Sequence, residues 1–148
     1  MRVNDIIEMA VRVENDGELF YTEAARVAED PKVRKTFEQL AAQEKAHAAS
    51  FRKLLEDQDE EWDEIDAYLS TYASANIIPD LNLIVPELKR MTVSEVIDLA
   101  IGIEKDSIIL YYELLDTLAD ERAKSVVRNI ISQEKEHVST LHNLRKGL

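Results

Sequence analysis

The sequence predicts an all-α protein: a four-helix bundle made of two helical hairpins joined by one long crossover. Three observations predict this class. Apolar and small residues recur every three or four positions in four long segments. Only 3 Gly and 3 Pro occur among 148 residues, which leaves few places for turns. The second half of the chain also repeats the first. We expect a single domain over residues 1–148.

The first hairpin is expected over residues 3–57. Its first helix follows the apolar pattern from residue 3 to residue 28. Asp30 is then placed to cap the second helix, and Pro31 occupies the first helical position, where its missing N–H costs nothing. The apolar pattern of the second helix ends near Asp57.

The crossover is expected over residues 58–91. It contains two Pro and no sustained helical pattern, so we expect only a short helix over roughly residues 60–73. A long connection between two hairpins is typical of bundles with a single crossover. The apolar run "NIIPDLNLIVPEL" is either a dimer contact or a segment lying across the bundle, and of these we favour a homodimer.

The second hairpin is expected over residues 92–146. Thr92 and Glu95 have the spacing of a capping box, which starts the third helix. Asp120 is placed to cap the fourth helix. The basic residues in the tail "RKGL" suit a helix C-terminus, where the helix dipole favours positive charge.

The two hairpins are similar in sequence. A shift of 90 residues aligns "AVRVENDGELFYTE" from Ala10 with "AIGIEKDSIILYYE" from Ala100, and "QEKAH" with "QEKEH", without a gap. A bundle of two similar hairpins has an approximate twofold axis. Anything on that axis is met by matching residues from both halves.

Composition excludes several classes of function. There is no Cys, which excludes disulfides, zinc–thiolate sites and thiol catalysis. The 30 acidic against 18 basic residues give a net charge of −12, which repels nucleic acid and favours cations. The apolar runs are too short for a membrane span, and the charged N-terminal stretch is no secretory signal. We therefore expect a cytoplasmic protein.

Six polar residues interrupt the apolar faces that should point into the bundle. They are Glu14, Glu44, His47, Glu104, Glu134 and His137. Buried carboxylates must protonate or find a positive partner, and no Lys or Arg lies on these faces. Two divalent ions would balance the four Glu charges. Oxygen and nitrogen ligands without sulfur suit iron or manganese, and of these we favour two iron ions.

The spacing also indicates how the ligands would divide. Residues three apart lie on one helix face, so each Glu-x-x-His can aim a carboxylate and an imidazole at one point. A single Glu-x-x-His on a charged helix is more often a solvated pair, but two copies on apolar faces favour a metal site. We predict that Glu44 and Glu134 bridge the metals. Glu14 with His47, and Glu104 with His137, complete the two sets.

Further residues on the same faces have two readings each. Tyr21 and Tyr111, two turns beyond Glu14 and Glu104, are either core aromatics or donors to a ligand carboxylate on a neighbouring helix. The small residues one turn beyond the same Glu residues either leave space for peroxide or dioxygen, or allow tight helix packing. We favour packing. These small residues are Gly17 and Ser107.

The paired motifs resemble the rubrerythrin branch of the ferritin-like di-iron carboxylate proteins. The resemblance rests on Glu14 with Tyr21, Glu104 with Tyr111, and the two "QEKxH" stretches. It implies a ferritin-like bundle in which the six inward-facing Glu and His residues ligate two irons. It also implies reduction of hydrogen peroxide or oxidation of ferrous iron by dioxygen or peroxide.

Two departures from the rubrerythrin pattern bear on activity. Full rubrerythrins carry a rubredoxin-like domain with a four-cysteine iron site, whereas this chain has no Cys, so a peroxidase would need a separate electron-donor protein. Rubrerythrins also carry an extra ligand carboxylate one turn along the third helix, where this chain has Ser107.

Three functions remain open from the sequence. The first is a di-iron oxidoreductase acting on peroxide or dioxygen. The second is a non-catalytic protein that binds and sequesters iron. The third, a metal-free helical interaction module, is disfavoured because four buried Glu without metal destabilise the fold.

Overall fold

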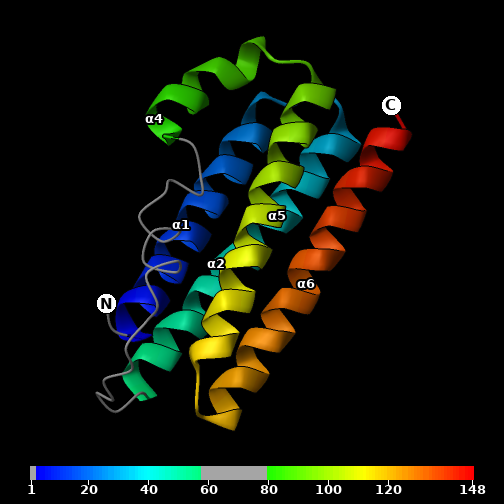
Figure 1. Cartoon of the computed structure of the whole chain (residues 1–148). Coiled ribbons are helices and arrows are strands. Elements are labelled where there is room, and N and C mark those ends of the chain that lie inside the picture. Colours follow the sequence, from blue (N-terminus) through cyan, green and yellow to red (C-terminus); the bar gives the residue numbers. More distant parts are fainter. Residues whose placement is uncertain (1–2, 58–79) are drawn as a thin grey trace.

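Four long helices form the bundle in the computed structural model, which describes residues 3–57 and 80–148 (Figure 1). The first hairpin consists of α1 (Val3–Val27) and α2 (Pro31–Asp57), and the second of α5 (Val93–Thr117) and α6 (Glu121–Lys146). Between them lie the short helix α4 (Leu81–Ile84) and the 3-10 helix η1 (Val85–Arg90). The predicted all-α fold of two hairpins is confirmed. The short helix predicted near residues 60–73 lies outside the described residues.

The helix starts follow the predicted caps. Thr92 Oγ1 accepts from the Glu95 backbone N–H, and the Glu95 carboxylate accepts from the Thr92 N–H, both at 3.1 Å. The Asp30 carboxylate accepts from the N–H of Lys32 at 2.8 Å. Asp120 plays the same part for α6. Such caps satisfy N–H groups left free at a helix start and each stabilises by about 1 kcal/mol.

Each long helix packs against two of the other three. Within the hairpins, α1 packs along α2 and α5 along α6. Between the hairpins, α1 contacts α5 and α2 contacts α6. These two contacts are called the α1–α5 seam and the α2–α6 seam below. Apolar side chains from all four helices fill one core, among them the fully buried Ile7, Phe51, Ile97 and Leu141.

The described end of the crossover lies partly against the bundle and partly in solvent. Leu88 of η1 is buried with 1% of its surface exposed, whereas Leu83 of α4 is 72% exposed. The apolar run over residues 76–88 is therefore divided, and residues 76–79 lie outside the described part. A homodimer through this run stays a prediction.

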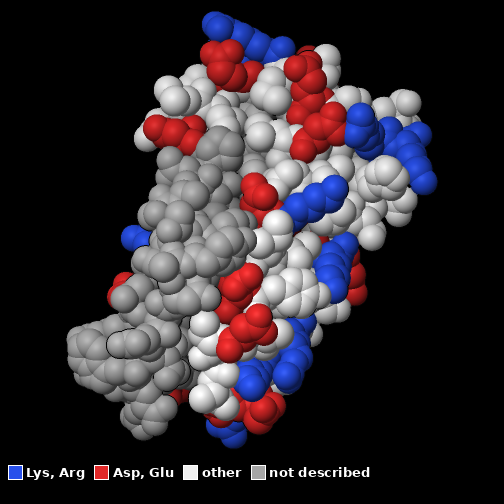
Figure 2. Space-filling model, viewed as in Figure 1, with Lys and Arg blue, Asp and Glu red and all other residues white. Residues whose placement is uncertain are grey.

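The surface carries charges of both signs. Figure 2 shows basic side chains of this face mainly over α6 and acidic ones mainly over α5. Arg145 of α6 donates a hydrogen bond to the carboxylate of Asp98 on α5. Exposed pairs of this kind contribute little to stability. No helix in the described ranges is both long and apolar enough to cross a lipid bilayer.

Candidate metal centre

The six polar residues predicted on the inner helix faces converge in the middle of the bundle. Each is between 0% and 4% exposed. They form two groups in which one oxygen or ring nitrogen per residue lies within 4.8 Å of the others. The first group is Glu14, Glu44, His47 and Glu134, and the second is Glu44, Glu104, Glu134 and His137. Glu44 and Glu134 belong to both groups, as the predicted bridging positions require.

Each histidine reaches across the α2–α6 seam with its Nδ1 atom. His47 Nδ1 lies 2.9 Å from Glu134 Oε1, and His137 Nδ1 lies 3.1 Å from Glu44 Oε1. His47 Nδ1 is also 3.7 Å from Glu14 Oε2, and His137 Nδ1 is 3.4 Å from Glu104 Oε1. The two rings lie nearly parallel, with centroids 5.6 Å apart. The Nδ1 atoms therefore face the carboxylates from opposite helices.

The two tyrosines close the α1–α5 seam. The Tyr21 hydroxyl donates to Glu104 Oε1 at 2.6 Å, and the Tyr111 hydroxyl donates to Glu14 Oε1 at 2.7 Å. The structure thus contains the hydrogen bonds that the second reading of these tyrosines requires. Burial raises the pKa of Tyr21 well above its ordinary value of 10, and the charge on Glu104 raises it further. The hydroxyl therefore stays protonated and remains a donor.

Sequence reasoning missed two residues beside the cluster, Gln43 and Gln133. Gln43 Oε1 contacts His137 Nε2, and Gln133 Oε1 lies 2.5 Å from His47 Nε2. Both glutamines lie off the apolar faces, so the helical pattern gave no reason to single them out. Their recurrence in "QEKAH" and "QEKEH" was the available signal.

The carboxylates repel one another when no cation is present. Burial raises the pKa of Glu44 well above its ordinary value of 4.5, and the charges of Glu14 and Glu104 raise it further. Burial, together with the charge of Glu134, raises the pKa of Glu104 to about 7. Without a metal, the cluster therefore holds protons that ordinary carboxylates have lost at pH 7.

The histidines supply the positive charge in the metal-free cluster. Burial lowers the pKa of His47, but its contacts with Glu134 and Glu14 outweigh this effect and raise the pKa to about 10. Burial also lowers the pKa of His137. Its contacts with Glu104 and Glu134 outweigh this effect and raise the pKa to about 9. In the metal-free protein, protons therefore occupy the Nδ1 atoms that a metal would bind.

Three carboxylate oxygens in the cluster test whether cations fit. Within the described residues, Oε2 of Glu14, of Glu104 and of Glu134 is buried and has no hydrogen-bond partner. A buried carboxylate oxygen without a hydrogen-bond partner costs free energy, so the protein groups alone do not satisfy these three oxygens. Carboxylate and imidazole donors without sulfur suit iron or manganese. The residues present therefore fit a pair of divalent ions.

The small residue Gly17 lies directly against the cluster. A Cβ atom at Gly17 would lie 3.2 Å from Glu44 Oε2, closer than ordinary contacts. The Glu44 carboxylate therefore occupies the space that the missing side chain leaves. At the matching position of α5, Ser107 is buried and donates to the Ile103 carbonyl oxygen at 2.9 Å. Tight packing, the favoured reading of both positions, agrees with these contacts.

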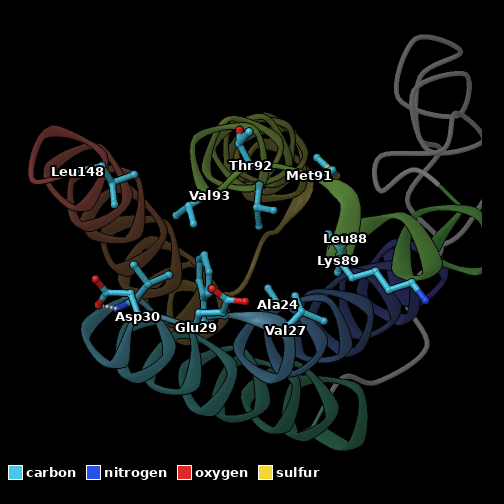
Figure 3. A pocket seen from close by; sticks show the side chains of 14 residues that line it. Ala24, Val27, Glu29, Asp30, Leu88, Lys89, Met91, Thr92, Val93 and Leu148 are labelled. Carbon is cyan, nitrogen blue, oxygen red and sulfur yellow. Dashed lines mark hydrogen bonds between the residues drawn. The ribbon is translucent and has the colours of Figure 1, made fainter.

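A cavity of about 470 Å³ lies at one end of the bundle. Figure 3 shows its labelled side chains around an opening bounded by the α1–α2 turn, η1 and the start of α5, with Leu148 near the end of α6. Phe37 lines the cavity and stacks on Tyr21, with ring centroids 6.1 Å apart. One aromatic ring therefore separates this cavity from a tyrosine that is hydrogen bonded to the cluster.

Comparisons with known proteins agree with this geometry. The sequence pattern of the rubrerythrin family matches residues 5–145. A Thermotoga maritima protein, described from its crystal structure as a candidate ferritin-like diiron-carboxylate protein, is 39% identical, with a TM-score of 0.84 over 99% of this chain and 95% of that one. A hypothetical protein from Pyrococcus furiosus, 22% identical, shares the fold, with a TM-score of 0.72 over 99% of this chain and 89% of that one.

No curated protein matches the sequence. The family match spans nearly the whole chain, and the Thermotoga structure shares both the bundle and more than a third of the residues. These findings confirm the resemblance drawn from the paired motifs. The chain belongs to the rubrerythrin family and has the ferritin-like fold.

Proposed function

We propose that the chain is a di-iron oxidoreductase that reacts with hydrogen peroxide or dioxygen. The observation that carries the proposal is the pair of ligand groups sharing Glu44 and Glu134, in which three buried carboxylate oxygens have no hydrogen-bond partner. The description of the Thermotoga relative as a candidate diiron-carboxylate protein supports the choice of iron.

The residues divide naturally between two ions. Glu14 and His47 would hold one ion, Glu104 and His137 the other, and Glu44 and Glu134 would lie between them. Two iron ions held there would supply redox chemistry, exchanging two electrons between their ferrous and ferric states. The remaining contributions come from the protein. The four carboxylates balance the charge, and their burial excludes bulk water.

Tyr21 and Tyr111 orient the two outer carboxylates. Each hydroxyl keeps its proton and donates a hydrogen bond to Oε1 of Glu104 or of Glu14, and the second oxygen of each carboxylate is left buried without a hydrogen-bond partner. Fixing the orientation of a ligand by an outer hydrogen bond is the usual way in which proteins adjust a metal site. A peroxidase would also need a separate electron-donor protein, since the chain has no Cys with which to hold an iron–sulfur site.

One observation favours the alternative function, iron sequestration without turnover. All six ligand residues are at most 4% exposed. Such closure slows the escape of a bound ion as well as the entry of an oxidant. The two functions therefore differ in whether the loaded centre reacts.

The test begins with metal content. The protein is reconstituted with ferrous iron under anaerobic conditions, and two irons per chain are expected; fewer than one per chain would overturn the proposal. The reduced protein is then mixed separately with peroxide and with dioxygen. A faster reaction with peroxide supports a peroxidase, and a faster reaction with dioxygen supports a ferroxidase or oxidase. Two stably bound irons that react with neither oxidant support sequestration.

A further inference from the structure

Two glutamines outside the ligand cluster contact its histidines crosswise. Gln43 on α2 is hydrogen bonded to His137 on α6, and Gln133 on α6 to His47 on α2. Each contact joins an amide oxygen to the ring atom Nε2, the nitrogen that faces away from the carboxylates. Both therefore cross the α2–α6 seam, and each hairpin contacts the histidine of the other.

The chemistry of imidazole fixes the direction of these bonds. A neutral ring has one N–H and one nitrogen with a free lone pair. The Nδ1 atoms face the carboxylates, so an ion in the cluster would take the lone pair of Nδ1. The proton then stays on Nε2, which donates to the glutamine oxygen. An amide oxygen is a suitable acceptor for that tautomer.

We propose that Gln43 and Gln133 are positioning residues, each of which fixes the tautomer and ring orientation of the histidine in the opposite hairpin. The inference rests on the proposed metal centre. Partners of this kind on a ligating histidine change metal affinity by about 10- to 100-fold when removed. A neutral amide orients the ring without raising its basicity as strongly as a carboxylate does.

The crosswise arrangement separates this role from a merely structural one. Gln43 and His47 lie one turn apart on the same helix, so a local disturbance of α2 would first affect His47. Positioning through the hydrogen bond instead affects His137, on another helix. A change at His137 after substitution of Gln43 therefore indicates positioning through the hydrogen bond, whereas a change at His47 indicates a local disturbance of α2.

The experiment uses zinc, a diamagnetic ion, and the full chain with ¹⁵N-labelled histidine. The variants are Gln43→Leu and Gln133→Leu, with Gln39→Leu as the matched control, since Gln39 is exposed one turn earlier on α2. Chelator competition gives the zinc affinity, and NMR follows the Nε2–H resonance of each ligand histidine. Gln43→Leu is expected to lower the affinity about 10- to 100-fold and to shift or broaden the His137 signal alone. Gln133→Leu should do the same to His47.

A variant that restores an acceptor completes the test. Gln43→Glu is expected to bind zinc at least as tightly as the wild type and to shift the His137 signal. An affinity for Gln43→Leu equal to that of the Gln39 control, or a response at His47 in its place, overturns the inference. Should Gln43→Leu fail to fold, an unchanged His137 signal in Gln43→Glu overturns it. A wild type that binds no zinc overturns the metal centre as well, whereas normal wild-type binding confines the failure to the glutamines.

Discussion

The two hairpins agree at the polar centre and differ in the apolar packing around it. A shift of 90 residues relates every member of the centre, including the tyrosine and glutamine hydrogen bonds. The aromatic neighbours do not follow this shift. Tyr21 stacks on Phe37, and Tyr111 packs on Phe51 with ring centroids 5.0 Å apart, so each tyrosine has an aromatic neighbour on α2.

The positions on α6 that match these phenylalanines are aliphatic. They are Val127 and Leu141, and both are fully buried. Apolar packing depends on total volume and tolerates changes of shape, whereas hydrogen bonds and metal ligation depend on direction and distance. The twofold arrangement therefore depends on the polar contacts more than on the apolar packing. Substitutions at matching positions of the two halves test this conclusion.

The largest effect is expected from the two shared carboxylates. Glu134→Ala and Glu44→Ala should each abolish the paired site, because each removes a ligand common to both ions. Metal content after reconstitution with ferrous iron measures this directly, and Glu136→Ala, an exposed position of α6, is the control. If either variant still bound two metals, the bridging assignment would be wrong. Unequal losses would break the symmetry of the centre.

The next effect is the dependence of metal affinity on pH. Contacts with carboxylates hold the pKa of His47 at about 10 and that of His137 at about 9 in the metal-free protein. Each ion must displace the proton of its own histidine, so its affinity should fall at least about tenfold per pH unit as the pH is lowered from 8 to 6. Chelator competition measures the slope for each ion. A flat profile would contradict the raised pKa values. His142→Ala, at an exposed position of α6 outside both ligand groups, should leave the slope unchanged.

The tyrosine hydroxyls should have an intermediate effect on stability. Tyr21→Phe and Tyr111→Phe each leave one oxygen of a buried carboxylate without its donor, which should lower the free energy of unfolding by roughly 1–3 kcal/mol. Urea denaturation of the metal-free protein measures this. Tyr112→Phe, which removes an exposed hydroxyl, serves as the control. Equal losses would support the symmetry, and losses below about 0.5 kcal/mol would refute the role of these bonds.

The smallest effect is expected at a position beside the centre where the residues of the two halves differ. Gly17→Ala forces the Glu44 carboxylate to move, so it should weaken metal binding about tenfold, or by about 1.4 kcal/mol. Ala also favours the helix by about 1 kcal/mol, so the metal-free protein should be no less stable. Ser107→Ala, at the matching position, should change the affinity far less. Equal affinities for both variants would show that Glu44 adapts freely.

The sequence predicted those features that depend on one helix at a time. The helical period alone places Glu14 on the inner face of α1, and the spacing of Thr92 and Glu95 alone starts α5. All six predicted ligands lie in the cluster, although their binding of metal stays a prediction.

The individual atom pairs that meet between two helices were less predictable in this way. Gln43 is exposed and off the inner face, and its contact with His137 depends on the rotation of α2 against α6. The same holds for the pairing of His47 with Glu134 rather than with Glu44 of its own helix. The cavity at the end of the bundle lies where the α1–α2 turn, η1 and the start of α5 meet. No single segment of the sequence therefore predicts it.

The crosswise hydrogen bonds have a consequence for the hairpin as a unit. Every bond of this set starts in one hairpin and ends in the other, so neither hairpin completes a single ion site alone. Each nevertheless carries one tyrosine, one glutamine, one histidine and two glutamates of the centre. Two copies of either hairpin, related by a twofold axis, would present the same ligands and the same four bonds. The inner face of each hairpin is thus self-complementary, and the chain contains two such hairpins.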